Sequence, residues 1–267
     1  MKHSGKRNLL TETLENFAQS KKMTLICALV MPVVFWLFLT LYEGVGYGMQ
    51  AEFCLADSFA LSTAPDVFFI GVALFTVFLN LYLQQNDTNI QYVVRHQTRR
   101  QLWCKQVGKT AILAAVMTVY VTLCTLVVGL IKSNSQSLVN FSQRNSLMFR
   151  MGRTIVAGVE FWQVVAMFCW YSFATIFVMS MVVVLSRWFF KKPLVGWLVM
   201  ILLGFVEYLD LQIGIFYNPM DVGYKLWADA GPEQILFRFW YPAIWIVVLF
   251  AAGFLAAGRK EYRNGET

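Results

Sequence analysis

Residues 110–131 read TAILAAVMTVYVTLCTLVVGLI, and this stretch decides the class of fold. It contains no charged residue, and at 1.5 Å of rise per residue it forms a helix about 33 Å long, close to the thickness of a bilayer's hydrocarbon core. Of the 267 residues in the chain, 58% are hydrophobic and only 14% are charged, against about 25% charged in an ordinary soluble domain. The sequence therefore predicts an all-α integral membrane protein.

Other apolar stretches bring the predicted number of transmembrane helices to six. They lie at residues 23–42, 67–83, 154–185, 194–210 and 239–258. The stretch 154–185 is longer than one crossing, but it has no proline and only one glycine, near its start, so we expect a single helix. Pro32 is acceptable inside the first span because neighbouring helices can hydrogen-bond to the carbonyl that a proline leaves free. Glycines and prolines break up residues 211–238.

The distribution of basic residues predicts the orientation. Of the 22 Lys and Arg residues, 16 lie in the N-terminal segment, in loops 84–109 and 186–193, and in the C-terminal tail. By the positive-inside rule these parts are cytoplasmic, and loops 43–66 and 132–153 are external. We expect three parts: a cytoplasmic segment 1–22 with an amphipathic interfacial helix at 8–20, a six-helix transmembrane domain 23–258, and a cytoplasmic tail 259–267.

Several function classes are disfavoured by the sequence. The net charge is +7. The charged residues lie between the apolar stretches and not on one basic face, so we expect no nucleic-acid partner. The five cysteines lack the spacing of a metal site, and the two histidines, His3 and His96, both fall in cytoplasmic segments. No glycine-rich phosphate loop is present. We therefore predict no catalytic residue, no metal site and no enzyme activity in this chain by itself.

Three acidic residues fall within or at the ends of predicted spans: Glu160 in the fourth, and Glu207 and Asp210 on one face of the fifth. Acidic groups inside a membrane are candidates for a substrate path or a gate. Asp210 is close enough to the predicted external interface to be simply hydrated there. Both interpretations stay open.

Loop 84–109 carries the most informative pattern. Its arginines alternate with aromatic residues, and the candidates for binding a partner protein are Tyr92, Arg95, Arg99, Arg100 and Trp103. Thr98 can begin a helix that carries Leu102 and Trp103. The charges alone would suit any cytoplasmic loop, whereas the interleaved aromatic side chains favour docking onto another protein.

The order of these features resembles the permease subunit of a type-2 ABC exporter. The local motif is Tyr92-Val93-Val94-Arg95-x-x-x-Arg99-Arg100-x-x-Trp103-x-Lys105, and the layout is most similar to small bacterial permeases for lantibiotic immunity and bacitracin resistance. The resemblance implies that loop 84–109 is a coupling helix seated in a cleft of a separate ATPase subunit. It also implies that 211–238 forms short helices in the outer leaflet.

The same resemblance implies an assembly in the plasma membrane of a bacterium. Two permease subunits, either two copies of this chain or one copy and a sister, would pair with two ATPase subunits, which bind the ATP and Mg²⁺. This chain would hold no cofactor and would export a peptide or amphipathic compound. Two alternatives remain: an ion-coupled secondary transporter that uses the three acids, and a non-transporting membrane immunity or assembly protein.

Overall fold

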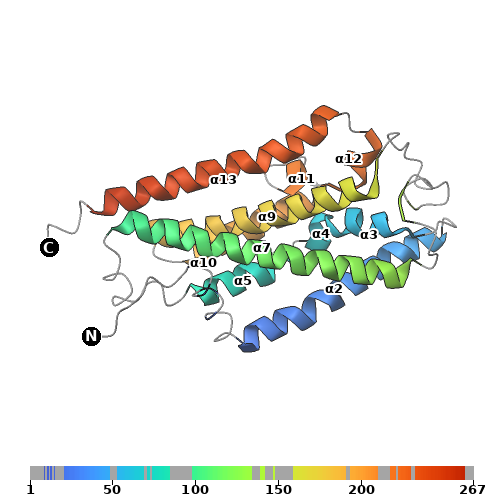
Figure 1. Ribbon diagram of the computed structural model, residues 1–267, viewed down its shortest axis with the longest axis horizontal. Helices are drawn as coiled ribbons and strands as arrows, with labels where there is room; N and C mark the ends of the chain where they lie inside the picture. The colour runs from blue at the N-terminus through green and yellow to red at the C-terminus, as the bar shows by residue number, and fades with distance from the viewer. Residues whose placement is uncertain are drawn as a thin grey trace.

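The computed structural model is a bundle of helices that run along one long axis (Figure 1). It describes residues 21–48, 53–68, 71–72, 74–84, 98–133, 139–141, 159–190, 193–209, 217–220, 222–229 and 232–261, with the single residues 9, 11, 13, 15 and 147. All regular structure in this part of the chain is helical, which confirms the predicted all-α fold class. Four helices are long and apolar enough to cross a membrane: α2 (Lys21–Gly48), α7 (Arg99–Lys132), α9 (Phe161–Phe190) and α13 (Pro232–Glu261).

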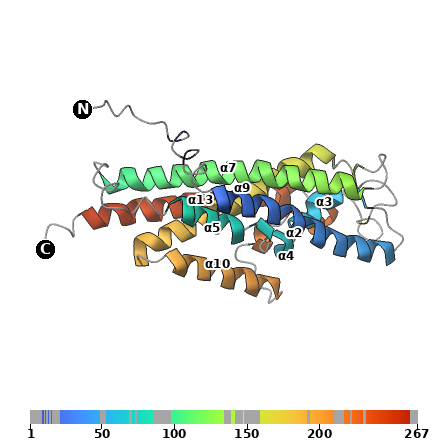
Figure 2. The same cartoon turned by 90° about the horizontal axis from the view of Figure 1, so that it is seen from below.

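Helix α9 lies at the centre of the bundle. It is mostly buried and packs against α7, α13 and α10 (Pro193–Tyr208) (Figure 2), whereas α2 and α13 are mostly exposed. The single helix predicted for this region is confirmed from Phe161 onward. It continues to Phe190, so Arg187, which the sequence placed in a loop, lies inside the helix. Its last turns are held by Arg187 and Trp188, whose side chains hydrogen-bond to Gln84 and Gln106.

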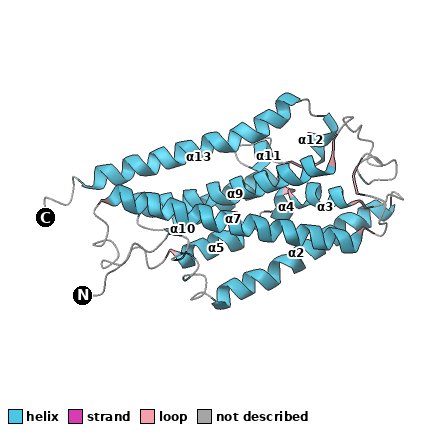
Figure 3. Ribbon diagram, viewed as in Figure 1, coloured by secondary structure: helices cyan, strands magenta, loops and turns pink. Residues whose placement is uncertain are grey.

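The predicted loop 43–66 and the predicted second span need correction. Helix α2 extends to Gly48, and α3 (Leu55–Ser62), α4 (Pro65–Phe68) and α5 (Leu74–Leu83) follow it (Figure 3). Every residue of α3 is buried, and this helix packs on α7 and α9. Hydropathy missed α3 because polar side chains lower its average, although they lie inside the protein; the Ser58 hydroxyl, for example, donates to the carbonyl of Leu55 at 2.6 Å.

The predicted broken segment 211–238 contains two short helices, α11 (Tyr217–Met220) and α12 (Tyr224–Asp229), and α13 begins earlier than predicted. Helix α12 is tied to α3 by one side-chain pair. The Tyr224 hydroxyl donates to Asp57 Oδ1 at 2.6 Å, while Asp57 Oδ2 accepts from the backbone N–H of Cys54 at 2.8 Å. Asp57 therefore caps the N-terminus of its own helix and holds a segment that is distant in sequence.

The ends of α2 and α7 at the right of Figure 1 are joined by an ion pair. Lys132 Nζ lies 2.7 Å from Glu43 Oε2 and 4.5 Å from the centre of the Trp36 ring. The Lys132 side chain is only 5% exposed. Since a buried ammonium group needs a counter-charge, this pair joins the last part of α2 to the end of α7.

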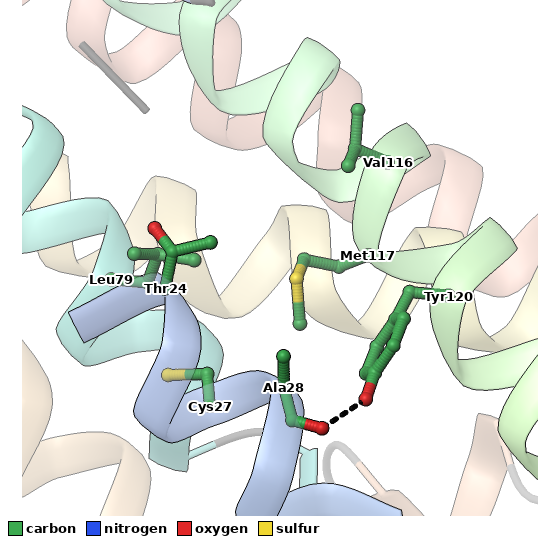
Figure 4. A pocket seen from close by; sticks show the side chains of 7 residues that line it. All are labelled: Thr24, Cys27, Ala28, Leu79, Val116, Met117 and Tyr120. Atoms are coloured by element: carbon green, nitrogen blue, oxygen red, sulfur yellow. Dashed lines mark hydrogen bonds between the residues drawn. The ribbon is translucent and has the colours of Figure 1, made fainter. Parts of the chain in front are cut away.

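Pro32 is accommodated as the sequence predicted. A proline in a helix leaves the carbonyl four residues earlier, here that of Ala28, without its usual donor. The hydroxyl of Tyr120 on α7 donates to this carbonyl (Figure 4). The interior of α2 is therefore completed by a side chain from its neighbour.

The substitution Tyr120→Phe is expected to lower the free energy of unfolding by about 1 kcal/mol, because it removes this hydrogen bond and leaves a buried carbonyl unpaired. In a Pro32→Ala background the backbone restores the carbonyl's donor, so the same substitution should cost much less. Thermal unfolding of the two single variants and the double variant in detergent gives the coupling. Equal costs in both backgrounds would contradict this role of Tyr120.

Candidate functional site at the helix ends around residues 85–97

The first turn of α7 lies where the sequence predicted a cytoplasmic loop. Thr98 begins the helix as predicted, since its Oγ1 accepts from the backbone N–H of Gln101 at 3.3 Å. Residues 99–109 are therefore the first turns of α7, and the loop is shorter than predicted. Of the proposed coupling residues, Tyr92 and Arg95 lie outside the described residues. The other three, Arg99, Arg100 and Trp103, stand on this helix.

Trp103 is an interior side chain, in contrast to its expected place at a docking surface. It is 0% exposed. Its indole Nε1 donates to the carbonyl of Phe250 on α13 at 3.2 Å, and its ring meets Trp188 of α9 edge to face at 6.1 Å. A Cβ at Gly253 would overlap the indole, so only glycine lets α13 approach this closely. Trp103 thus packs α7, α9 and α13 together and offers no surface to a partner.

Arg100 lies across the end of α13. Its guanidinium stands 4.9 Å from the centre of the Phe254 ring, at the distance of a cation–π contact, while the residue itself remains exposed. Arg99 is half-buried and also interacts within the chain. Arg100 therefore links the start of α7 to α13 and also reaches the surface.

Gln84, the residue immediately before segment 85–97, is the centre of a buried hydrogen-bond network. Its Nε2 donates to Asn80 Oδ1 on α5 and to Thr110 Oγ1 on α7, both at 2.8 Å. Its backbone carbonyl accepts from Arg187 Nη1 on α9 at 2.9 Å. The backbone N–H of Gln84 also donates to the carbonyl of Asn80. These four hydrogen bonds link Gln84 to α5, α7 and α9.

A second contact ties α7 to α9 beside this network. Trp188 Nε1 donates to Gln106 Oε1 at 2.8 Å, and Trp188 is the ring that packs against Trp103. Gln84, at one end of segment 85–97, is therefore held by hydrogen bonds to three helices, whereas Thr98, at the other end, bonds within the first turn of α7. We call the contacts that join the helices here the helix-end clamp; its members are Asn80, Gln84, Arg100, Trp103, Gln106, Thr110, Arg187 and Trp188.

No protein-family model, curated protein or solved structure matches this chain. What the site can do is therefore argued from its own geometry. Gln84 is bonded to α5, α7 and α9, and Thr98 caps α7, so a displacement of either residue would bear directly on these helices. Trp103 and Trp188 join α7 to α9 and α13 through their hydrogen bonds and ring contact.

The N-terminal segment also contacts this end of α7. Leu9 Cδ2 lies 2.7 Å from the point where a Cβ on Gly108 would stand, and Thr13 is buried, with its hydroxyl donating to the Leu9 carbonyl at 2.8 Å. These residues belong to the predicted amphipathic helix 8–20. The apolar side chain of Leu9 in this segment packs on α7 at Gly108.

The three acidic candidates are not brought together in the described residues. Glu160 is exposed and precedes the first turn of α9, so it is not inside a span as predicted; its carboxylate accepts from the Trp162 indole. Glu207 lies near the end of α10 and is only 3% exposed. Asp210 lies outside the described residues. Glu207 is thus the acid whose burial is consistent with a role inside the bundle.

Sequence reasoning missed Gln84, Gln106, Arg187 and Trp188 as parts of this site. The available signal was their position: polar or aromatic residues at the ends of apolar stretches, next to the basic loop. Positive-inside reasoning assigned such residues to solvent. It had no means of recognising that their partners come from another helix.

Proposed function

We propose that this chain is the transmembrane permease subunit of an ATP-driven ABC exporter that moves a peptide or amphipathic compound outward. Segment 85–97 docks on a separate ATPase subunit, which binds ATP and Mg²⁺ and supplies the energy. The helix-end clamp carries the resulting movement into α5, α7, α9 and α13. The observation that supports this proposal is that Gln84, at one end of the segment, is hydrogen-bonded to α7 and α9, while Thr98, at the other end, caps α7.

The proposed assembly holds two permease subunits and two ATPase subunits in the plasma membrane of a bacterium, with both termini cytoplasmic. We infer six crossings, in which α10 and the series α3 to α5 supply the two that the long helices do not. Support comes from the direction of the chain in Figure 1: α2 and α7 run to the right, and α5, α9 and α13 return to the left.

The test is co-purification of the ATPase subunit from mild detergent. Because Trp103 is buried, the docking contact falls to the residues of segment 85–97, so the double substitution Tyr92→Ala and Arg95→Ala should reduce the recovered ATPase at least tenfold, the effect of losing roughly 1.4 kcal/mol or more at an interface. Insertion in the membrane should be unchanged, since the apolar helices are untouched.

Tyr262→Ala with Arg263→Ala is the matched control, because it removes the same two side chains from the tail on the same predicted side of the membrane. It should retain the ATPase. If the Tyr92/Arg95 variant binds the ATPase and exports as well as this control, segment 85–97 is only a topology determinant and the proposal fails. Failure to recover any ATPase with the unmodified chain would also contradict the proposal.

The burial of Glu207 favours a second candidate, an ion-coupled secondary transporter. In that case Glu207→Gln with Asp210→Asn should abolish transport driven by a proton gradient in vesicles without ATP. An exporter should show no such transport before substitution. Export assayed with ATP alone and with a gradient alone therefore separates the two functions.

A further inference from the structure

An apolar cavity of about 160 Å³ lies between α2, α5 and α7 (Figure 4). Its lining consists of Thr24, Cys27, Ala28, Leu79, Val116, Met117 and Tyr120. An apolar cavity of similar size in another protein stays dry and binds benzene. This one therefore has room for a compact apolar group, and the Tyr120 hydroxyl is already engaged with Ala28 on its wall.

The cavity reaches the outer surface of the bundle. Val116, one of its lining residues, is 44% exposed. The residues beside the lining on α2 and α7 are large, apolar and exposed, among them Leu25, Leu29 and Val119. On helices long and apolar enough to cross a membrane, such a surface faces hydrocarbon. The group next to the cavity mouth is then a lipid tail and not water.

Two lysines precede the cavity's lining residues on α2. Lys21 and Lys22 form the start of α2, both are exposed, and the first turn of that helix holds no acidic residue. Thr24 and Ala28 of the lining follow within two helical turns, at about 1.5 Å of rise per residue. Lysines at a helix end reach the interface, where they attract anionic headgroups.

We propose that this cavity is a specific site for one anionic phospholipid, with part of one acyl chain between α2, α5 and α7 and its headgroup on Lys21 and Lys22. The bound chain would support the part of α2 before Pro32, which is held to α7 by the Tyr120 hydrogen bond. The inference goes beyond the exporter function. It requires only that these helices lie in a membrane, so it can be tested without an ATPase subunit or a transport assay.

The test uses the full chain in nanodiscs that contain phosphatidylglycerol with a diazirine on its acyl chain. After illumination, cross-linked peptides should come from the lining residues of α2 and α7. Met117→Trp fills the cavity and should reduce this labelling severalfold. Val127→Trp, on an exposed position of the same helix, is the matched control and should be labelled like the unmodified chain. Equal labelling of the two variants would overturn the proposal.

Two further variants keep the test decisive. Ala28→Leu adds a smaller group on the opposite wall and should also reduce labelling. It takes the place of Met117→Trp in the test if that variant fails to fold. Lys21→Gln with Lys22→Gln should lower the preference for phosphatidylglycerol over phosphatidylcholine by about 25-fold, since each lysine near an anionic surface contributes roughly a fivefold preference. Equal labelling by the two lipids in the unmodified chain would show that no headgroup is recognised, and would overturn the site's specificity for an anionic lipid.

Discussion

Replacing Trp103 by alanine is expected to lower the free energy of unfolding by about 3–5 kcal/mol, as for other fully buried tryptophans. The loss has two sources. A cavity opens where α7, α9 and α13 meet, and the Phe250 carbonyl loses the indole donor that it has at 3.2 Å. The measurement is the thermal unfolding of the purified chain in mild detergent.

Trp240→Ala is the control, because Trp240 is 55% exposed on α13 and its loss should change the stability by less than about 0.5 kcal/mol. Trp103→Phe should be intermediate, since it retains part of the ring packing but not the hydrogen bond. If Trp103→Ala unfolds at the same temperature as Trp240→Ala, Trp103 is not the interior side chain described above. If Trp103→Ala reduces ATPase binding without changing the stability, Trp103 belongs to the docking contact after all.

Lys132→Met is expected to destabilise the protein by about 3 kcal/mol, because it takes the positive partner from a carboxylate that is itself mostly buried. Replacing both members, Lys132→Met with Glu43→Leu, should restore most of the stability, since an apolar pair of similar volume needs no counter-charge. The quantity to compare is the unfolding free energy of the two single variants and the double variant.

Lys22→Met provides a control for the loss of a lysine at an exposed helix end and should have little effect on unfolding. A double variant as unstable as the sum of the two single variants would contradict the idea that the pair acts as a unit. In that event the position of α2 depends on its other contacts, such as the Tyr120 hydrogen bond.

The long helices could be predicted because they are apolar on their exposed faces as well as on their buried ones. Residues 110–131, 161–185 and 239–258 are helical as expected, and Pro32 has the neighbouring donor that membrane helices require. Helix α3 could not be predicted. Asp57 and Ser58 read as loop residues in any hydropathy window, and the Tyr224 hydroxyl that accompanies Asp57 is remote in sequence.

At the candidate site, too, one part could be predicted from the sequence and another could not. The helix start at Thr98 follows from local chemistry, because a threonine side chain caps the N–H groups that come after it. The burial of Trp103 depends on Gly253 and Trp188, which no local pattern links to it. Charge patterning assigned the region around Trp103 to the cytoplasm, but it carries no information on which side chains point inward.

The bond between Tyr224 and Asp57 has a consequence for the synthesis of the chain. Its two ends are 167 residues apart, and at about 5–20 residues per second the ribosome needs roughly 10–30 s to deliver the second after the first. During that interval the α3 segment lacks its hydrogen-bond partner, and until α9 (Phe161–Phe190) has been made it also lacks the helix that covers it. A nascent chain halted before residue 224 should therefore be a preferred substrate of membrane quality-control proteases. In the completed chain the same segment is buried and should resist them.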